Sequence, residues 1–186
     1  MLSYGANSRV IGTNVTALST NSNAPGATAW GTTATDNVAL SLTGGSVQTQ
    51  GTNSHGLYAR GALATLSVDG TSVTTSGQGA FAARVINGTL NASNATLQAS
   101  GVDGTGLGLS SDAGVTATAT LTGGTLSSAQ SDAIAVNGGT AQVTLTGTQV
   151  TGASRWLHVI GTSTLTANPL ALSLIHISEP TRRRGI

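Results

Sequence analysis

Few side chains of this sequence could do chemistry, and they are scattered. A glycosidase needs two carboxylates close together, and a calcium site needs several oxygen ligands in one place. Asp103 and Asp112 fall near loops of one repeat and could share a site, whereas a turn is the simpler role for Asp69 before Gly70. The aspartates of residues 1–171 are Asp36, Asp69, Asp103, Asp112 and Asp132.

Arginine is the other candidate, because polysaccharide lyases need Lys or Arg as a base and this chain has no lysine. Arg60 and Arg84 are 24 residues apart, so they are expected to end the third strand of successive repeats and to stack as neighbours. Such a pair could be catalytic or glycan-binding, but a solvated edge is the commoner role of exposed arginines. We assign no catalytic residue and predict that the protein is not an enzyme.

Metal and nucleotide sites find no support in the sequence. His55 and His158 lie far apart in the repeat, without a third ligand, and cysteine is absent. The run Gly104-Thr105-Gly106-Leu107-Gly108 is not a dinucleotide fingerprint, because no helix is expected after it. We therefore predict no metal site and no cofactor.

These side chains must be positioned by a repeated unit, which residues 40–47 show best. Leu40, Leu42 and Val47 are apolar, and the pair Gly44-Gly45 lies between them. Alternation with Ser and Thr predicts two short strands, and a glycine predicts a corner with positive φ. The same spacing recurs at Leu66/Val68/Val73, Leu90/Ala92/Leu97, Ala119/Leu121/Leu126 and Val143/Leu145/Val150, with corners at Gly44, Gly70, Asn94, Gly123 and Gly147.

A third apolar pair in each copy predicts a third strand. The pairs are Leu57/Ala59, Phe81/Ala83, Leu107/Leu109, Ile134/Val136 and Leu157/Val159. A repeat of 24–29 residues is typical of solenoids, in which stacked coils share one core. We predict an all-β fold, a right-handed parallel β-helix of about five to six coils. The Thr-x-Thr run at Thr116–Thr120 is similar to ice-binding β-helices, but the uneven period argues against a regular threonine array.

Three regions are expected along the chain. Residues 1–39 are predicted to form a degenerate first coil, with Ile11 and Leu18 at core positions and Trp30 either closing the core or lying on the surface. Residues 40–171 are predicted to form the β-helix repeats. Residues 172–186 are predicted to be a non-native tail, because Leu172–Arg182 resembles the translation of a transposase-adapter oligonucleotide from sequencing libraries.

Charge limits the partners that we expect. The formal net charge of +1 depends on three C-terminal arginines, and residues 1–171 hold four arginines against five aspartates. A nucleic-acid partner normally requires a basic face, so we predict none. No apolar stretch is long enough for a membrane span, and Met1–Tyr4 does not begin a signal peptide. Either the protein stays inside the cell or its native N-terminus is missing, and we expect the second because the repeat begins almost at once.

The repeats resemble the passenger domains of pertactin-like bacterial autotransporters. The segment VALSLTGGSVQTQG at residues 38–51, followed by GLYA at residues 56–59, carries the resemblance, which covers about residues 10–170. It implies a secreted or cell-surface fragment that acts as a non-enzymatic stalk or adhesin and is natively linked to an outer-membrane β-barrel absent from this sequence. The implied partners are a host surface glycan, a host protein or further copies of itself. The alternative is a carbohydrate-active β-helix, either a polysaccharide lyase or a tailspike-type glycosidase.

Overall fold

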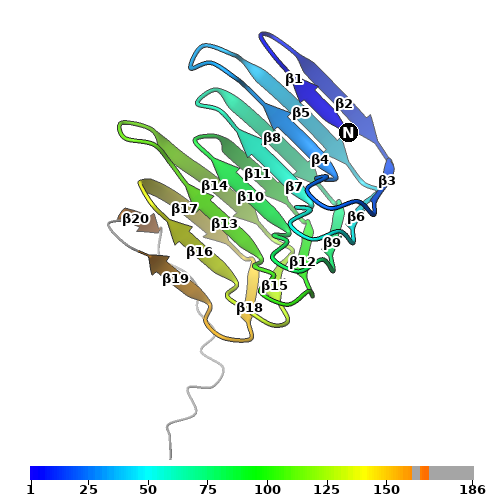
Figure 1. Cartoon of the computed structure of the whole chain (residues 1–186), viewed down its shortest axis with the longest axis vertical. Helices are drawn as coiled ribbons and strands as arrows, with labels where there is room; N and C mark the ends of the chain where they lie inside the picture. Colours follow the sequence, from blue (N-terminus) through cyan, green and yellow to red (C-terminus); the bar gives the residue numbers. More distant parts are fainter. Residues whose placement is uncertain (161–163, 168–186) are drawn as a thin grey trace, which may run out of the picture.

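The computed structural model describes residues 1–160 and the strand Thr164–Ala167. Every regular element in this part is a strand, and the strands wind into a parallel β-solenoid whose coils stack along the molecule (Figure 1). The predicted fold class, a parallel β-helix of five to six coils, is confirmed. No helix of the described part is long and apolar enough to cross a membrane. The predicted tail, residues 172–186, lies outside the described residues.

Three parallel sheets form the walls of the solenoid. Sheet A contains β1 (Leu2–Tyr4), β4 (Ala27–Trp30), β7 (Leu57–Arg60), β10 (Ala83–Ile86), β13 (Leu107–Ser110), β16 (Ile134–Asn137) and β19 (Leu157–Ile160). Sheet B contains β2 (Arg9–Thr13), β5 (Val38–Thr43), β8 (Ala64–Asp69), β11 (Thr89–Ser93), β14 (Thr116–Thr122), β17 (Thr140–Thr146) and β20 (Thr164–Ala167). Sheet C contains β3 (Thr16–Ser19), β6 (Ser46–Thr49), β9 (Ser72–Thr75), β12 (Thr96–Ala99), β15 (Thr125–Ser128) and β18 (Gln149–Gly152).

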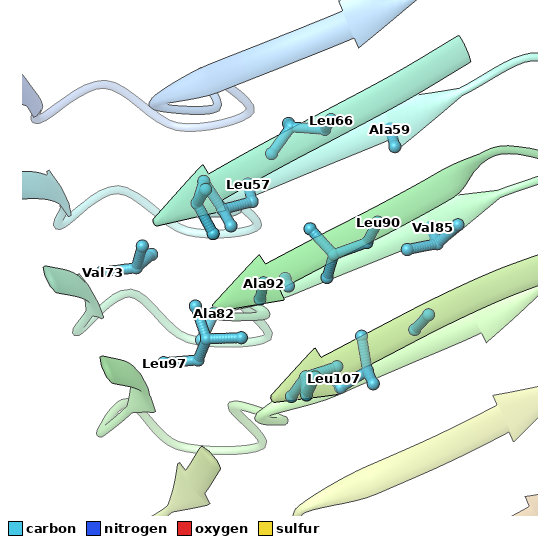
Figure 2. Packing of buried hydrophobic residues seen from close by; sticks show 14 of the residues in the cluster. Leu57, Ala59, Leu66, Val73, Ala82, Val85, Leu90, Ala92, Leu97 and Leu107 are labelled. Atoms are coloured by element: carbon cyan, nitrogen blue, oxygen red, sulfur yellow. The ribbon is translucent and has the colours of Figure 1, made fainter. Parts of the chain in front are cut away.

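The core consists of apolar columns that run through successive coils. Leu40 is in register with Leu66, and Leu42 with Val68. Farther along, Leu121 is in register with Leu145, and these side chains are all at least 93% buried. Figure 2 shows the packing around Leu66 and Leu90, which are also in register. Burying each such side chain is worth about 1.5–3 kcal/mol, so the predicted inward stacks are confirmed and supply the main stabilisation.

The corner between sheets B and C needs a left-handed residue in every coil. The five predicted residues have φ between 49° and 65°, and Asn14 has the same conformation in the first coil. In this region a side chain with a branched Cβ would clash with the backbone, so glycine and asparagine are selected there. The corner prediction is confirmed.

The first coil is shifted by one residue from the prediction. Ile11 and Leu18 are 64% and 61% exposed, while Val10 and Ala17 are in register with Leu40 and Val47. Gly12 occupies the position equivalent to Leu42, because Val15 and Met1 already fill the space that a side chain would take. The assignment of Ile11 and Leu18 to the core is wrong. These two exposed residues have the same seven-residue spacing as the core residues of the later coils.

The third strand of one coil is also shifted. Ala83 and Val85, rather than Phe81 and Ala83, are in register with Leu57 and Ala59. Ala82 and Ala83 are fully buried, whereas Phe81 precedes the strand and its ring lies on the outer side against Gly108. Phe81 is therefore not a core residue.

Candidate functional site on the outer face of sheet A

Aromatic rings gather on the outer face of sheet A. Tyr4 and Trp30 are in register on β1 and β4, and their ring centroids are 5.8 Å apart at 87°. The ring centroids of Trp30 and Tyr58 are 6.5 Å apart. Those of Tyr58 and His55 are 5.7 Å apart, and those of His55 and Phe81 are 5.1 Å apart. These five residues, Tyr4, Trp30, Tyr58, His55 and Phe81, form a continuous row that we call the aromatic ridge. Trp30 thus lies on the surface, which settles an alternative that the sequence left open.

Local backbone structure positions the end of the ridge. His55 and Phe81 occupy equivalent places in the loops that precede β7 and β10, and Gly56 N–H donates to the Phe81 carbonyl. The Phe81 N–H is 3.2 Å from His55 Nδ1. A Cβ on Gly108 would lie 2.4 Å from the Phe81 ring, so a side chain at residue 108 would displace that ring. The glycine therefore makes room for the aromatic residue one coil earlier.

Two arginines lie against the ridge. The Arg60 guanidinium is 5.2 Å from the centre of the Trp30 ring, and the Arg84 guanidinium is 5.1 Å from that of Phe81. The prediction that they stack as direct neighbours is wrong, because Arg84 is opposite Tyr58 and Arg60 is opposite Ile86. They do share the same face, and neither forms an ion pair with a carboxylate among the described residues.

His55, near the end of the ridge, is held neutral. His55 is only 8% exposed, and its Nε2 is 3.3 Å from Arg84 Nη1. Burial first, and then the positive charge of Arg84, lower the pKa of His55 to about 4. A neutral imidazole has one acceptor nitrogen, so it can accept from Phe81 N–H or from Arg84, but not from both.

A groove follows the ridge on the same face. It has a volume of about 190 Å³ and lies over β10, β13, β16 and β19. Phe81 and Arg84 line one side, and Asp132 and His158 line another. Gly108 and Ala135 lie at outward positions between them, in register across the sheet.

Asp132 organises the far side of this groove. Its carboxylate accepts from Arg155 Nε at 2.8 Å and from Arg155 Nη2 at 3.2 Å, and it is 2.7 Å from His158 Nδ1. Burial of this side chain raises the pKa of Asp132, but the hydrogen bonds and charges of Arg155 and His158 outweigh burial and hold the pKa below its usual value. Asp132 is therefore a charged structural partner.

The remaining carboxylates are dispersed. Asp103 and Asp112 lie in loops at opposite ends of β13, so the predicted shared site is not formed. Asp112 is instead bonded to Asn87, and Asp103 takes a left-handed turn conformation. Asp36 accepts from the hydroxyls of Thr32 and Thr33, and Asp69 is exposed at the corner before Gly70. Among the described residues, no three acidic, histidine or cysteine side chains are grouped for a metal ion.

The aromatic ridge was not predicted from the sequence, although the spacing of its aromatic residues could have indicated it. Tyr4, Trp30 and Tyr58 recur at nearly the repeat period, and each falls in a third strand. The sequence holds only five Phe, Trp and Tyr residues, and four of them lie in the ridge.

The chain matches no family model, no curated protein and no solved structure.

Proposed function

We propose that this chain is part of a secreted or cell-surface β-solenoid of the autotransporter passenger type, and that it acts as a non-enzymatic stalk whose sheet A binds a glycan. The observation that carries the glycan-binding role is the aromatic ridge. Trp30, Tyr58 and Phe81 are partly exposed on one face, although a ring gains most from burial in the core. Rigid aromatic rings with polar handles are the side chains that dominate binding surfaces.

The arrangement favours a glycan over a folded protein. The ridge is one row of rings with hydrogen-bonding groups beside them, including the Tyr58 hydroxyl and the Arg60 guanidinium. A pyranose ring offers an apolar face for stacking and hydroxyls for such groups. An enzymatic role has less support, because the described carboxylates are not paired at the spacing that glycoside hydrolysis requires.

A printed glycan array tests the binding role. We expect the full chain to bind members of the array, and the double change Trp30→Ala and Tyr58→Ala to weaken binding by about tenfold or more, since truncating such anchors commonly costs about 2 kcal/mol or more. The matched control is Thr118→Ala with Thr120→Ala on sheet B, which should bind as the unaltered chain does. Equal binding by both double variants would contradict the proposal.

The autotransporter origin has a separate test. The DNA on either side of this reading frame is expected to encode a secretion signal upstream and an outer-membrane β-barrel downstream. The β-solenoid fold, the repeat style and the absence of cysteine support this origin. A flanking frame that encodes a cytoplasmic enzyme would contradict it without affecting the glycan-binding proposal.

A further inference from the structure

One column of outward residues on sheet A explains why a hollow follows the ridge. Tyr58, Arg84, Gly108, Ala135 and His158 follow one another across five adjacent strands. Adjacent strands lie about 4.8 Å apart, so the small residues Gly108 and Ala135 separate two large polar side chains by about 14 Å of sheet. The groove is a consequence of this small pair between Arg84 and His158.

The charges that face the groove do not cancel. The Asp132 carboxylate is engaged by both Arg155 and His158. Arg84 has no carboxylate partner among the described residues, and its guanidinium lies against the Phe81 ring and His55 Nε2. The His55 imidazole is neutral, so it leaves the guanidinium charge in place. An anion bound in the groove would compensate the positive charge of Arg84.

The Arg84 side chain is also preorganised for binding an anion. Its guanidinium is stacked on the Phe81 ring, so it loses less conformational freedom on binding than a mobile arginine would. A guanidinium presents its donors in a planar fork that matches a carboxylate. The groove has a volume of about 190 Å³, enough for one ring-sized group.

We infer that the groove binds the carboxylate-bearing sugar of an acidic glycan, an inference that rests on the proposed glycan-binding function. The carboxylate lies on the Arg84 guanidinium, and the sugar ring lies over Ala135, beside the Phe81 ring that covers Gly108. His158 faces the sugar hydroxyls from the other side, since its Nδ1 is committed to Asp132. A nucleic acid fits less well, because Arg60 and Arg84 are the only arginines of this face without a carboxylate partner among the described residues, whereas nucleic-acid sites use many phosphate contacts.

The test uses matched pairs on a glycan array, each acidic member printed beside its desialylated or carboxyl-reduced partner. The full chain is expected to prefer the acidic member by about tenfold, as a charge-assisted pair would give. Arg84→Gln should abolish that preference. Arg60→Gln removes the same charge from the ridge outside the groove, so it should weaken acidic and neutral members alike and keep the preference between them. Ala135→Phe fills the groove without a change in charge and should weaken binding of the acidic members.

Further samples separate other sources of affinity. Arg182, Arg183 and Arg184 are changed together to glutamine, and the acidic preference should persist, because the inference assigns that preference to Arg84. If Arg84→Gln and Arg60→Gln lower the ratio of acidic to neutral binding equally, general charge attracts the ligand and the inference is wrong. Stronger binding of single-stranded oligonucleotides printed on the same array, lost in Arg84→Gln, would also overturn it. Equal binding of acidic and neutral partners contradicts only this inference, whereas no glycan binding at all contradicts the proposed function too.

Discussion

The outer faces of sheets A and B differ sharply, although their inner faces are alike. Both inner faces present Leu, Val, Ile and Ala in register. The outward positions of β5, β8, β11, β14 and β17 are occupied by small or polar residues, mostly Thr and Ser, and Asp69 is the one charged residue among them. Sheet A instead presents aromatic rings, two arginines and a hollow. The fold therefore requires only the inner pattern, and the outer face of sheet A carries residues that the fold does not need.

The regularity of sheet B also corrects one argument from the sequence. The uneven period was expected to prevent a regular threonine array. The extra residues lie in the loop between β13 and β14, and β11, β14 and β17 remain in register residue by residue. Insertions are absorbed where the chain turns, so an uneven period does not distort the sheets.

The largest expected effect separates the inside from the outside of sheet B. Leu121→Asp places a carboxylate in a position that is 2% exposed, and we expect a loss of about 4 kcal/mol or more in the free energy of unfolding. Thr120→Asp, one residue away on the outer face, should change it by about 0.5 kcal/mol. Chemical denaturation of both variants provides the measurement, and similar losses would contradict the assigned faces.

The next largest effect is a pH dependence of the free energy of unfolding, which arises from His55 beside sheet A. The pKa of His55 falls from 6.5 in the unfolded chain to about 4 in the folded one, so the unfolded chain binds more protons between these values. Stability should therefore be complete above pH 6.5 and fall as the pH is lowered to 4, by on the order of 3 kcal/mol. Asp36 and Asp132, whose pKa values lie below 3.8, act only under more acidic conditions.

The control for this pH dependence is His55→Gln. Denaturation at pH 7 and pH 4.5 should show a much smaller difference for this variant than for the unaltered chain. An equal pH dependence in the two proteins would show that His55 is not the group responsible.

A smaller effect compares single outward side chains. Tyr58→Ala removes two edge-to-face or tilted ring contacts, with Trp30 and His55, and should destabilise the protein by about 1–2 kcal/mol. Thr65→Val, on the neighbouring coil of sheet B, should stay within about 0.5 kcal/mol. If the two changes cost the same in denaturation experiments, the ridge is no better packed than an ordinary outer face.

The smallest effect concerns the inside of sheet C, where the same change should have opposite signs in successive coils. Thr49 and Thr75 are in register, and Thr49 Oγ1 donates to the Ser54 carbonyl, whereas Thr75 Oγ1 has no partner among the described residues. Thr75→Val should stabilise the protein by about 1 kcal/mol, and Thr49→Val should destabilise it by a similar amount. Thermal melting distinguishes the two signs, and a matching sign would show that the hydroxyls are not what matters there.

Particular residues show how far the sequence could predict this molecule. Gly44, Gly123 and the column through Leu121 were identified because their conformation and burial are dictated locally and repeated in each coil. Ile11 and Phe81 were misplaced because hydrophobicity does not distinguish a core residue from a surface ring or an exposed isoleucine. The groove could not be predicted, because it depends on which residues 23 to 27 positions apart become neighbours, and a shift of two residues changes every such pairing on the face.

A two-dimensional NMR titration with an acidic glycan selected from the array tests the central claim most directly. We expect the shifts to concentrate on the Trp30 indole N–H, the Arg84 side chain and the amides around Gly108, with none on the outer residues of β14 and β17. Shifts concentrated on sheet B, or spread evenly over the coils, would contradict the claim that sheet A is the binding face.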